Sequence, residues 1–366
     1  MKLIELFQNE IIRLPFHQQA DPKKSFREFL FEKLDAYKSK IDSLDFSELP
    51  SIFSPDVEKL LVTNLIEGIK KSVDLYLDGY PFDAYSELKK SFDMSMFSHL
   101  THGTLPEDRS LYRLRKEKGA YSLTQKELFH IPFNNRIKVS TQRYSIPGFP
   151  SLYAANSVYV AWEELGRPTP DQVQACRLQT KKPITFFDLT TDVYLGETTV
   201  LNSLKPEDLW KHLIVWPLIA SCSVKVLDRE AAFKPEYIIP QLILQIVRKE
   251  KKWDGIRFSS THIDLNKMKS AKGAFYNYVL PVKENKNDGY CDKLNELFEM
   301  TEIVPWQIVD TFTKPQGTFL HPKDTTPYEI QAIELISEKP LAYQYSIFGT
   351  LEKRLIFMTP TKIITS

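Results

Sequence analysis

The sequence predicts an α+β protein in which an α-helical N-terminal region precedes a mixed-sheet domain. Apolar residues recur near the helical period through the first hundred positions. From about residue 105, Pro, Gly, Asn and Asp become denser, and the runs between them are short and β-rich. We therefore predict a helical region at 1–104 and a second domain at 105–366.

The N-terminal region is expected to form amphipathic helices. Asp21-Pro22 and Ser54-Pro55 mark helix starts, because a polar side chain caps free amides and proline is tolerated in the first turn. The apolar positions that follow these starts are Phe26, Phe29, Leu30, Leu34 and Tyr37, and then Val57, Leu60, Leu61, Leu65, Ile69 and Val73. We expect a scaffold, an interaction surface or a regulatory region here, with no chemistry of its own.

The second domain alternates between helical and strand patterns. A capping box at Thr124–Glu127 indicates a short helix, because each of the two side chains can satisfy a free amide. Further helices are predicted at 158–165 and 238–250, strands at 184–189, 276–282 and 355–358, and a helix and strands in a C-terminal extension at 286–366. The apolar stretch from Leu213 to Ala220 contains Pro217 and is predicted to be buried core.

The composition excludes several classes of partner. The 366 residues are 42% hydrophobic, which suffices for one large or two ordinary domains. The 48 basic and 47 acidic residues leave a formal net charge of +1, so no global attraction to nucleic acid or to an anionic membrane is expected. Any anion site must be local.

The cysteines and the N-terminus indicate a cytoplasmic protein. Three cysteines, far apart in sequence, give neither a disulfide framework nor metal-ligand spacing. Glu5, Glu10 and Arg13 interrupt the N-terminal apolar residues, where a secretion signal needs an unbroken run. No apolar stretch has the length that a membrane-spanning helix requires.

The segment from Arg143 to Tyr153, followed by 161–165, contains the strongest candidates for catalytic and substrate-binding residues. It combines arginine, tyrosine and carboxylates. Arginine can fork onto a pyrophosphate, tyrosine can stack on a base, and a carboxylate can stabilise an oxocarbenium-like sugar. Glycine-rich phosphate loops and a serine elbow are absent from the sequence, so a nucleotide, if bound, would be held by side chains, and we expect no cofactor. His99 and His102 have no evident third ligand, so we expect no metal site.

These motifs together resemble the RES family, named for its arginine, glutamate and serine. The resemblance covers roughly 105–285 with the motifs in order, and the segment 346–352 resembles the tail of a longer bacterial subfamily. The matching segments are Leu111–Arg115, Phe129–Arg136, Arg143–Ser145, Leu152–Tyr153, Ala161–Glu164 and Trp253–Ser260.

The resemblance implies a fold related to ADP-ribosyltransferases and an activity that consumes NAD⁺. The nicotinamide–ribose bond would be split by water or by inorganic phosphate, with NAD⁺ as substrate. Many relatives are toxins of toxin–antitoxin pairs, so an antitoxin or regulatory partner is implied. The compact toxins lack a helical region like 1–104, which leaves control by a separate antitoxin or by this region as alternatives.

The resemblance also assigns roles to single residues. Arg113 and Arg143 would grip the pyrophosphate, and Tyr153 would place its ring against nicotinamide or ribose. Glu164 would stabilise the cationic sugar, and Ser260 would hydrogen-bond a ribose hydroxyl or the carboxamide. We therefore predict Glu164, Tyr153 and Ser260 as catalytic and Arg113, Arg143, Tyr153 and Ser260 as substrate-binding.

Alternatives remain at two of these positions and for the function. Glu164 follows Tyr153 by eleven residues, the spacing of the family, but Glu163 is adjacent to it. Ser259 is the alternative to Ser260, because neighbouring strand residues face opposite sides. The protein could instead be an ADP-ribosyltransferase acting on a macromolecule or a non-catalytic nucleotide-binding interaction protein, and a homo-oligomer is left open.

Overall fold

The computed structural model describes residues 1–18, 24–94, 102–117, 121–309 and 329–363, and the chain divides into two compact units. Unit 1 comprises Met1–His102, Gln142–Tyr144 and Phe187–Ile246, and unit 2 comprises Gly103–Thr141, Ser145–Phe186 and Val247–Ser366. The first division falls two residues before the predicted boundary. Residues 187–246, which the sequence assigned to the second domain, belong to unit 1 instead.

Unit 1 is helical, and two of its helices begin with the expected types of residue. Helix α2 begins after Ser25, which forms a capping box with Glu28, whereas Asp21-Pro22 lies outside the described residues. Helix α3 has Pro55 in its first turn, as predicted. The helices are α1 (Leu3–Phe7), α2 (Phe26–Asp42), α3 (Pro55–Leu77), α4 (Pro81–Met94), α7 (Thr198–Ser203) and α8 (Pro206–Cys222), together with most of α9 (Ile238–Glu250).

Helix α8 explains why residues 187–246 join the N-terminal helices. Its stretch from Leu213 to Ala220 is buried throughout, so the prediction of a core segment is confirmed. The Tyr37 ring of α2 stacks on Trp216 with centroids 4.0 Å apart, and the Tyr37 hydroxyl donates to the carbonyl of Leu213 at 2.6 Å. Because the second half of α8 is buried on all sides, it is most stable where other helices surround it.

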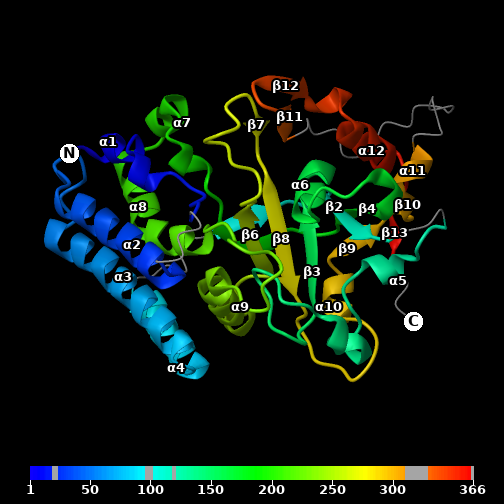
Figure 1. The fold of residues 1–366 in the computed structure, drawn as a ribbon, viewed down its shortest axis with the longest axis horizontal. Helices are drawn as coiled ribbons and strands as arrows, with labels where there is room; N and C mark the ends of the chain where they lie inside the picture. Colours follow the sequence, from blue (N-terminus) through cyan, green and yellow to red (C-terminus); the bar gives the residue numbers. More distant parts are fainter. Residues whose placement is uncertain (19–23, 95–101, 118–120, 310–328, 364–366) are drawn as a thin grey trace. The chain divides into compact units, whose positions relative to one another are not determined.

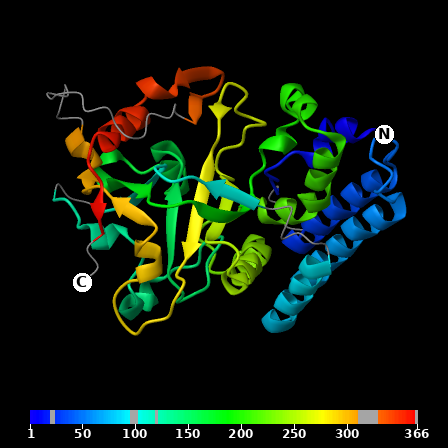
Figure 2. The ribbon, with the colours of Figure 1, turned by 180° about the vertical axis from the view of Figure 1, so that it is seen from behind.

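Unit 2 is built on a large sheet with the strand order β1-β5-β6-β8-β3-β2-β4-β9-β13, in which β10 also pairs with β4. Strands β3 and β8 lie side by side in it (Figure 1), and the same pair is seen from behind in Figure 2. The strands are β1 (His102–Leu105), β2 (Ser110–Lys116), β3 (Ser151–Ala155), β4 (Val173–Thr180), β5 (Ile184–Leu189), β6 (Gly255–Ser259), β8 (Tyr276–Pro281), β9 (Phe298–Met300), β10 (Val304–Pro305) and β13 (Thr361–Lys362). A second, three-stranded sheet joins β12 (Lys339–Ala342), β11 (Ile330–Ile336) and β7 (Lys272–Gly273).

Antiparallel pairing with β8 sets the register of the two strands that carry predicted site residues. Tyr153 of β3 pairs with Val279, and Ile256 of β6 pairs with the same residue from the other side. Gly255 allows this approach, because a Cβ atom at its position would lie 2.2 Å from the carbonyl oxygen of Val279. A side chain there would force β6 and β8 apart.

Most of the elements predicted after residue 105 are confirmed. Thr124 and Glu127 form the predicted capping box, and β5, β8, α6 and α9 lie where the patterns placed them. The predicted strand at 355–358 is wrong, because Phe348, Leu351 and Leu355 bury one face of a helix, α12. The helices are α5 (Gln125–Leu128), α6 (Val158–Glu164), α10 (Asp292–Asn295), α11 (Trp306–Val309) and α12 (Ile347–Ile356).

The fold is therefore α+β, as predicted, with several helices and a large sheet. In the part of the chain that the structure describes, no helix combines the length and the apolar character needed to cross a bilayer.

Candidate active site

Glu164 is the last residue of α6, and polar side chains from two other segments of unit 2 meet its carboxylate. The Ser260 hydroxyl donates to Oε1 at 2.7 Å, and Asn277 Nδ2 donates to the same oxygen at 2.8 Å. His262 Nε2 lies 3.4 Å from Oε2. We call these four residues the carboxylate cluster. Hydrogen bonds to a carboxylate are stronger than neutral ones, so this arrangement fixes the side chain of Glu164 and favours its negative charge.

The cluster remains open to solvent at the carboxylate, although its donors are buried. The side chain of Glu164 is 32% exposed, whereas Ser260 and Asn277 are 3% and 6% exposed. The rigid donors therefore hold a carboxylate that a molecule from solvent can reach. A solvent-accessible side chain that buried hydrogen-bond donors hold in one orientation is typical of a functional site.

The adjacent Glu163 is placed quite differently. Its side chain is 3% exposed, and its Oε2 accepts a hydrogen bond from Arg167 Nε at 2.9 Å. Consecutive residues of a helix point about 100° apart, so only one of the two glutamates can face the cluster. The geometry favours Glu164 for the carboxylate role and gives Glu163 an ion pair within its own helix region.

The two candidate serines, Ser260 and Ser259, also differ in where their side chains point. Ser259 is paired with Tyr276 in the ladder between β6 and β8, whereas Ser260 follows the strand and its amide donates to the carbonyl of Phe275. Neighbouring residues of an extended chain face opposite sides, and the Ser260 side chain is the one that reaches Glu164.

Asn277 and His262 are cluster members that the sequence analysis missed. Asn277 lies within β8, which the sequence analysis predicted only as a strand. His262 lies two residues after Ser260, and its backbone amide donates to the Ser260 hydroxyl at 3.2 Å. His262 lies in a turn, where strand periodicity does not apply, so its closeness to Ser260 in the sequence was the available signal.

Tyr153 projects from the same face of the sheet as Asn277. In the ladder between β3 and β8, Tyr153 pairs with Val279 and Ala155 pairs with Asn277. Directly paired side chains share a face, so Tyr153 and Asn277 lie about 7 Å apart along the strands on one side. The half-buried ring of Tyr153 thus belongs to the side of the sheet that carries the cluster.

Arg113 is not brought into the cluster. It alternates in β2 with Tyr112 and Leu114, which pack with α6, so its side chain leaves the sheet on the opposite face. There its guanidinium donates to the carbonyl of Leu128 and, at 2.6 Å, to the carbonyl of Tyr153. Burial lowers the pKa of Arg113 below its ordinary value. The guanidinium links β3 to α5, and this corrects the expectation that it points toward the same site as Glu164.

Arg143 belongs to unit 1, and backbone carbonyls there occupy its guanidinium. Nη1 donates to the carbonyl of Cys222 at 2.9 Å and Nη2 to that of Val224 at 3.0 Å. The residue is 8% exposed, and its guanidinium lies over the ring of Tyr237. The planar fork thus serves two backbone carbonyls at and just after the end of α8, whereas the sequence analysis predicted a pyrophosphate as its partner.

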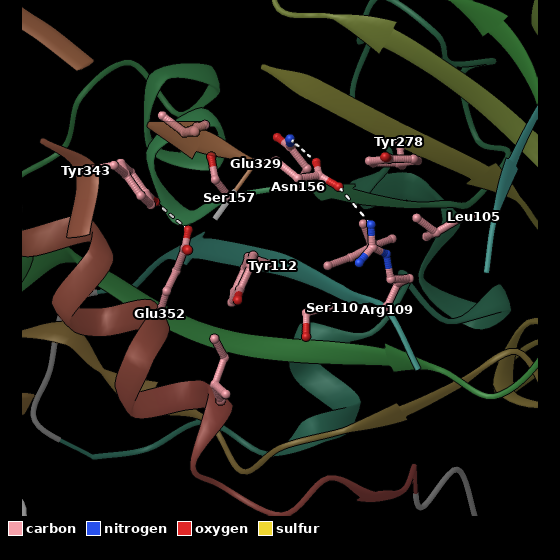
Figure 3. Close-up of a pocket in the computed structure, with 13 residues that line it drawn as sticks. Leu105, Arg109, Ser110, Tyr112, Asn156, Ser157, Tyr278, Glu329, Tyr343 and Glu352 are labelled. Atoms are coloured by element: carbon pink, nitrogen blue, oxygen red, sulfur yellow. Dashed lines mark hydrogen bonds and ion pairs between the residues drawn. The ribbon is translucent and has the colours of Figure 1, made fainter. Parts of the chain in front are cut away.

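A cavity of about 50 Å³ lies near the N-terminal end of α6 (Figure 3). Space of this size holds about three water molecules and is too small for a dinucleotide. On one side of it, the buried carboxyl of Glu352 accepts hydrogen bonds from the Val158 amide, at 2.6 Å, and from the Tyr343 hydroxyl. Burial raises the pKa of Glu352 to about 8. Glu352, from the tail segment 346–352, therefore anchors the start of the helix that ends in Glu164.

On the other side of the same cavity, Glu329 contacts Asn156 and Arg109. Asn156 Nδ2 donates to Glu329 Oε2 at 2.6 Å, and Arg109 Nη2 lies 3.7 Å from Glu329 Oε1. The two carboxyl groups of the cavity wall, Glu329 and Glu352, thus both have hydrogen-bonding neighbours, while leucine and isoleucine side chains make up much of the remaining lining.

The comparisons with known proteins give one relative and no structural match. No family model matches the chain, and no solved structure matches it. The chain is 30% identical over 304 residues to a protein of Bacillus subtilis (strain 168) named "Putative toxin YopC". The matched part covers 75% of this chain and 66% of that protein, so the chain spans slightly less than two thirds of its relative's length.

Proposed function

We propose that the protein is an NAD⁺-consuming enzyme that cleaves the bond between nicotinamide and ribose, and that it acts as a toxin. The carboxylate cluster is the observation that carries the proposal, because it presents one exposed carboxylate held by buried donors. The resemblance of the motifs to the RES family supports it, and so does the name of the Bacillus subtilis relative. An ADP-ribosyltransferase-like fold for unit 2 is part of the proposal.

The chemistry needs one well-placed negative charge. Nicotinamide leaves NAD⁺ as a neutral molecule, so its departure requires no general acid. The ribose gains positive charge at its anomeric carbon in the transition state, and a preorganised carboxylate stabilises that charge more than it stabilises the substrate. Glu164 supplies this charge in the proposal, and Ser260 and Asn277 keep it oriented.

Tyr153 completes the proposed site as the ring that stacks on nicotinamide or ribose. It shares a sheet face with Asn277 and is only half-buried. Arg113 contributes indirectly, because it binds the carbonyl of Tyr153 and so holds this strand. An antitoxin or another regulatory partner would bind the protein to restrain the activity.

The test is incubation of the purified full chain with NAD⁺, with and without inorganic phosphate, followed by measurement of free nicotinamide. Release of nicotinamide is the expected result. Labelled ADP-ribose appearing on protein or nucleic acid would instead indicate a transferase, and NAD⁺ binding without turnover would indicate a nucleotide-binding interaction protein. Either of these outcomes would replace the proposal.

A further inference from the structure

We propose that His262 is the general base that activates the attacking water, so that the enzyme is a glycohydrolase. This inference rests on the function proposed above and names the acceptor that the function leaves open. It starts from the two oxygens of Glu164, which have different neighbours. Ser260 and Asn277 both donate to Oε1, whereas the imidazole of His262 lies beside Oε2.

The hydrogen bonds to Oε1 fix the direction of Oε2. Two donors from separate segments, Ser260 after β6 and Asn277 in β8, determine the torsion of the carboxylate, so Oε2 keeps a constant position relative to His262 Nε2, 3.4 Å away. Asn277 is therefore a positioning residue in this scheme, because it acts through Glu164. The imidazole is also held from its own backbone, since the amide of His262 donates to the Ser260 hydroxyl.

The imidazole is suitable for proton transfer at this place. Its side chain is 16% exposed, which leaves access for a water molecule, and a neutral imidazole carries one ring nitrogen that can accept a proton. Nε2 faces the carboxylate of Glu164 and keeps its proton, so the other ring nitrogen, Nδ1, is the one that accepts a proton. The imidazolium that forms lies next to this carboxylate, which stabilises it, as in the carboxylate–histidine pairs of enzymes that activate hydroxyl groups.

The proposed step balances as follows. The water oxygen forms a bond to the anomeric carbon of the ribose, and the bond from that carbon to the nicotinamide nitrogen breaks. The bonding electrons leave with nicotinamide, which departs neutral. One O–H bond of water breaks, its proton passes to Nδ1 of His262, and the imidazolium later releases the proton to solvent. The products are ADP-ribose and nicotinamide, and no other reactant is needed.

Azide tests the base directly, because it is an anionic nucleophile that carries no proton to remove. The full chain and the variants His262→Asn and His262→Gln are incubated with NAD⁺ in phosphate-free buffer, with and without sodium azide, and nicotinamide is measured. Lys267→Ala is the matched control, since this side chain is 70% exposed on the same loop. Thermal unfolding of each variant is measured in parallel, and the two His262 replacements differ in size so that one can fold where the other does not.

The unmodified protein should release nicotinamide without phosphate, and loss of the base should slow this release by about a hundredfold or more. Azide should restore most of the rate in the His262 variants and yield an azido derivative of ADP-ribose, whereas Lys267→Ala should match the unmodified protein throughout.

Full activity of a folded His262 variant, or a loss that azide does not restore, would overturn the role of His262. A requirement for phosphate in the unmodified protein would overturn water as the acceptor. Failure of the unmodified protein to release nicotinamide under any condition would overturn the proposed function itself.

Discussion

The Ser260 hydroxyl donates a 2.7 Å hydrogen bond to the carboxylate of Glu164, although the two residues are 96 positions apart in the sequence. The bond joins the residue that follows β6 to the last residue of α6. It brings together two of the residues whose types named the family that the sequence resembles. The bond therefore defines the centre of the candidate site.

Replacing Ser260 by alanine should reduce nicotinamide release about 10- to 100-fold, because hydrogen bonds to charged groups contribute about 1.5–3 kcal/mol. The measurement is the rate of release at saturating NAD⁺. Ser259→Ala is the control, since Ser259 faces the other side of the β6 segment. Equal effects of the two replacements would show that the bond between Ser260 and Glu164 does not support the reaction.

Replacing Arg113 by lysine should lower the free energy of unfolding by about 1–3 kcal/mol, because an ammonium group cannot serve both the Leu128 and the Tyr153 carbonyl with a planar fork. Denaturant unfolding measures this change. Arg115→Lys is the control, since the side chain of Arg115 is 44% exposed and surface changes have effects within about 0.5 kcal/mol. An unchanged unfolding free energy for Arg113→Lys would argue against the structural role assigned to this guanidinium.

His130 should make the fold less stable in acid. Its Nε2 accepts a hydrogen bond from the Cys291 amide at 2.8 Å, and burial lowers the pKa of His130 from 6.5 to about 4. Between about pH 6.5 and pH 4, the unfolded chain therefore binds a proton at His130 that the folded chain does not bind. The free energy of unfolding falls as the pH decreases over this range, by about 3 kcal/mol at most.

His130→Gln tests this expectation, because glutamine can accept the same hydrogen bond without titrating. Chemical denaturation at a series of pH values should show a smaller acid slope for the variant than for the unmodified protein. Parallel curves for the two proteins would exclude His130 as a source of acid sensitivity.

Glu352 should have the opposite pH dependence. Burial raises its pKa from 4.5 to about 8, so the unfolded chain loses this proton at a lower pH than the folded chain does. The contribution of Glu352 to the free energy of unfolding is fully present below pH 4.5. It is lost as the pH rises to about 8, and the free energy of unfolding then falls by up to about 1.4 kcal/mol per pH unit.

Glu352→Gln removes the titrating group and keeps an oxygen that can accept from Val158 and Tyr343. Relative to the unmodified protein, this variant should gain stability steadily between pH 5 and pH 8 in chemical denaturation. A constant difference over that range would mean that Glu352 does not titrate there.

Local patterns predicted the elements that depend on neighbouring residues. The capping box at Thr124 and the helix at 238–250 were found because their signals lie within a few positions of each other. The spacing from Tyr153 selected Glu164 over Glu163, and the structure separates the two by the helical twist that puts one against Arg167 and the other against Ser260.

Other features depend on contacts between distant residues, which the sequence does not reveal. Asn277 meets Glu164 from 113 positions away, and nothing near either residue indicates this pairing. Arg113 has the residue type of an anion ligand, but the alternation of β2 and the carbonyl of Tyr153 determine where it points. Residues 187–246 join unit 1 because α8 packs with the N-terminal helices, a contact outside any local window.

The most direct test compares Glu164→Gln with Glu163→Gln in the release of nicotinamide from NAD⁺, with thermal unfolding measured for both. The account predicts that Glu164→Gln keeps its fold and loses at least about a hundredfold in rate, because the charge that stabilises the ribose is gone, while Glu163→Gln remains active. A fully active, folded Glu164→Gln protein would contradict the account.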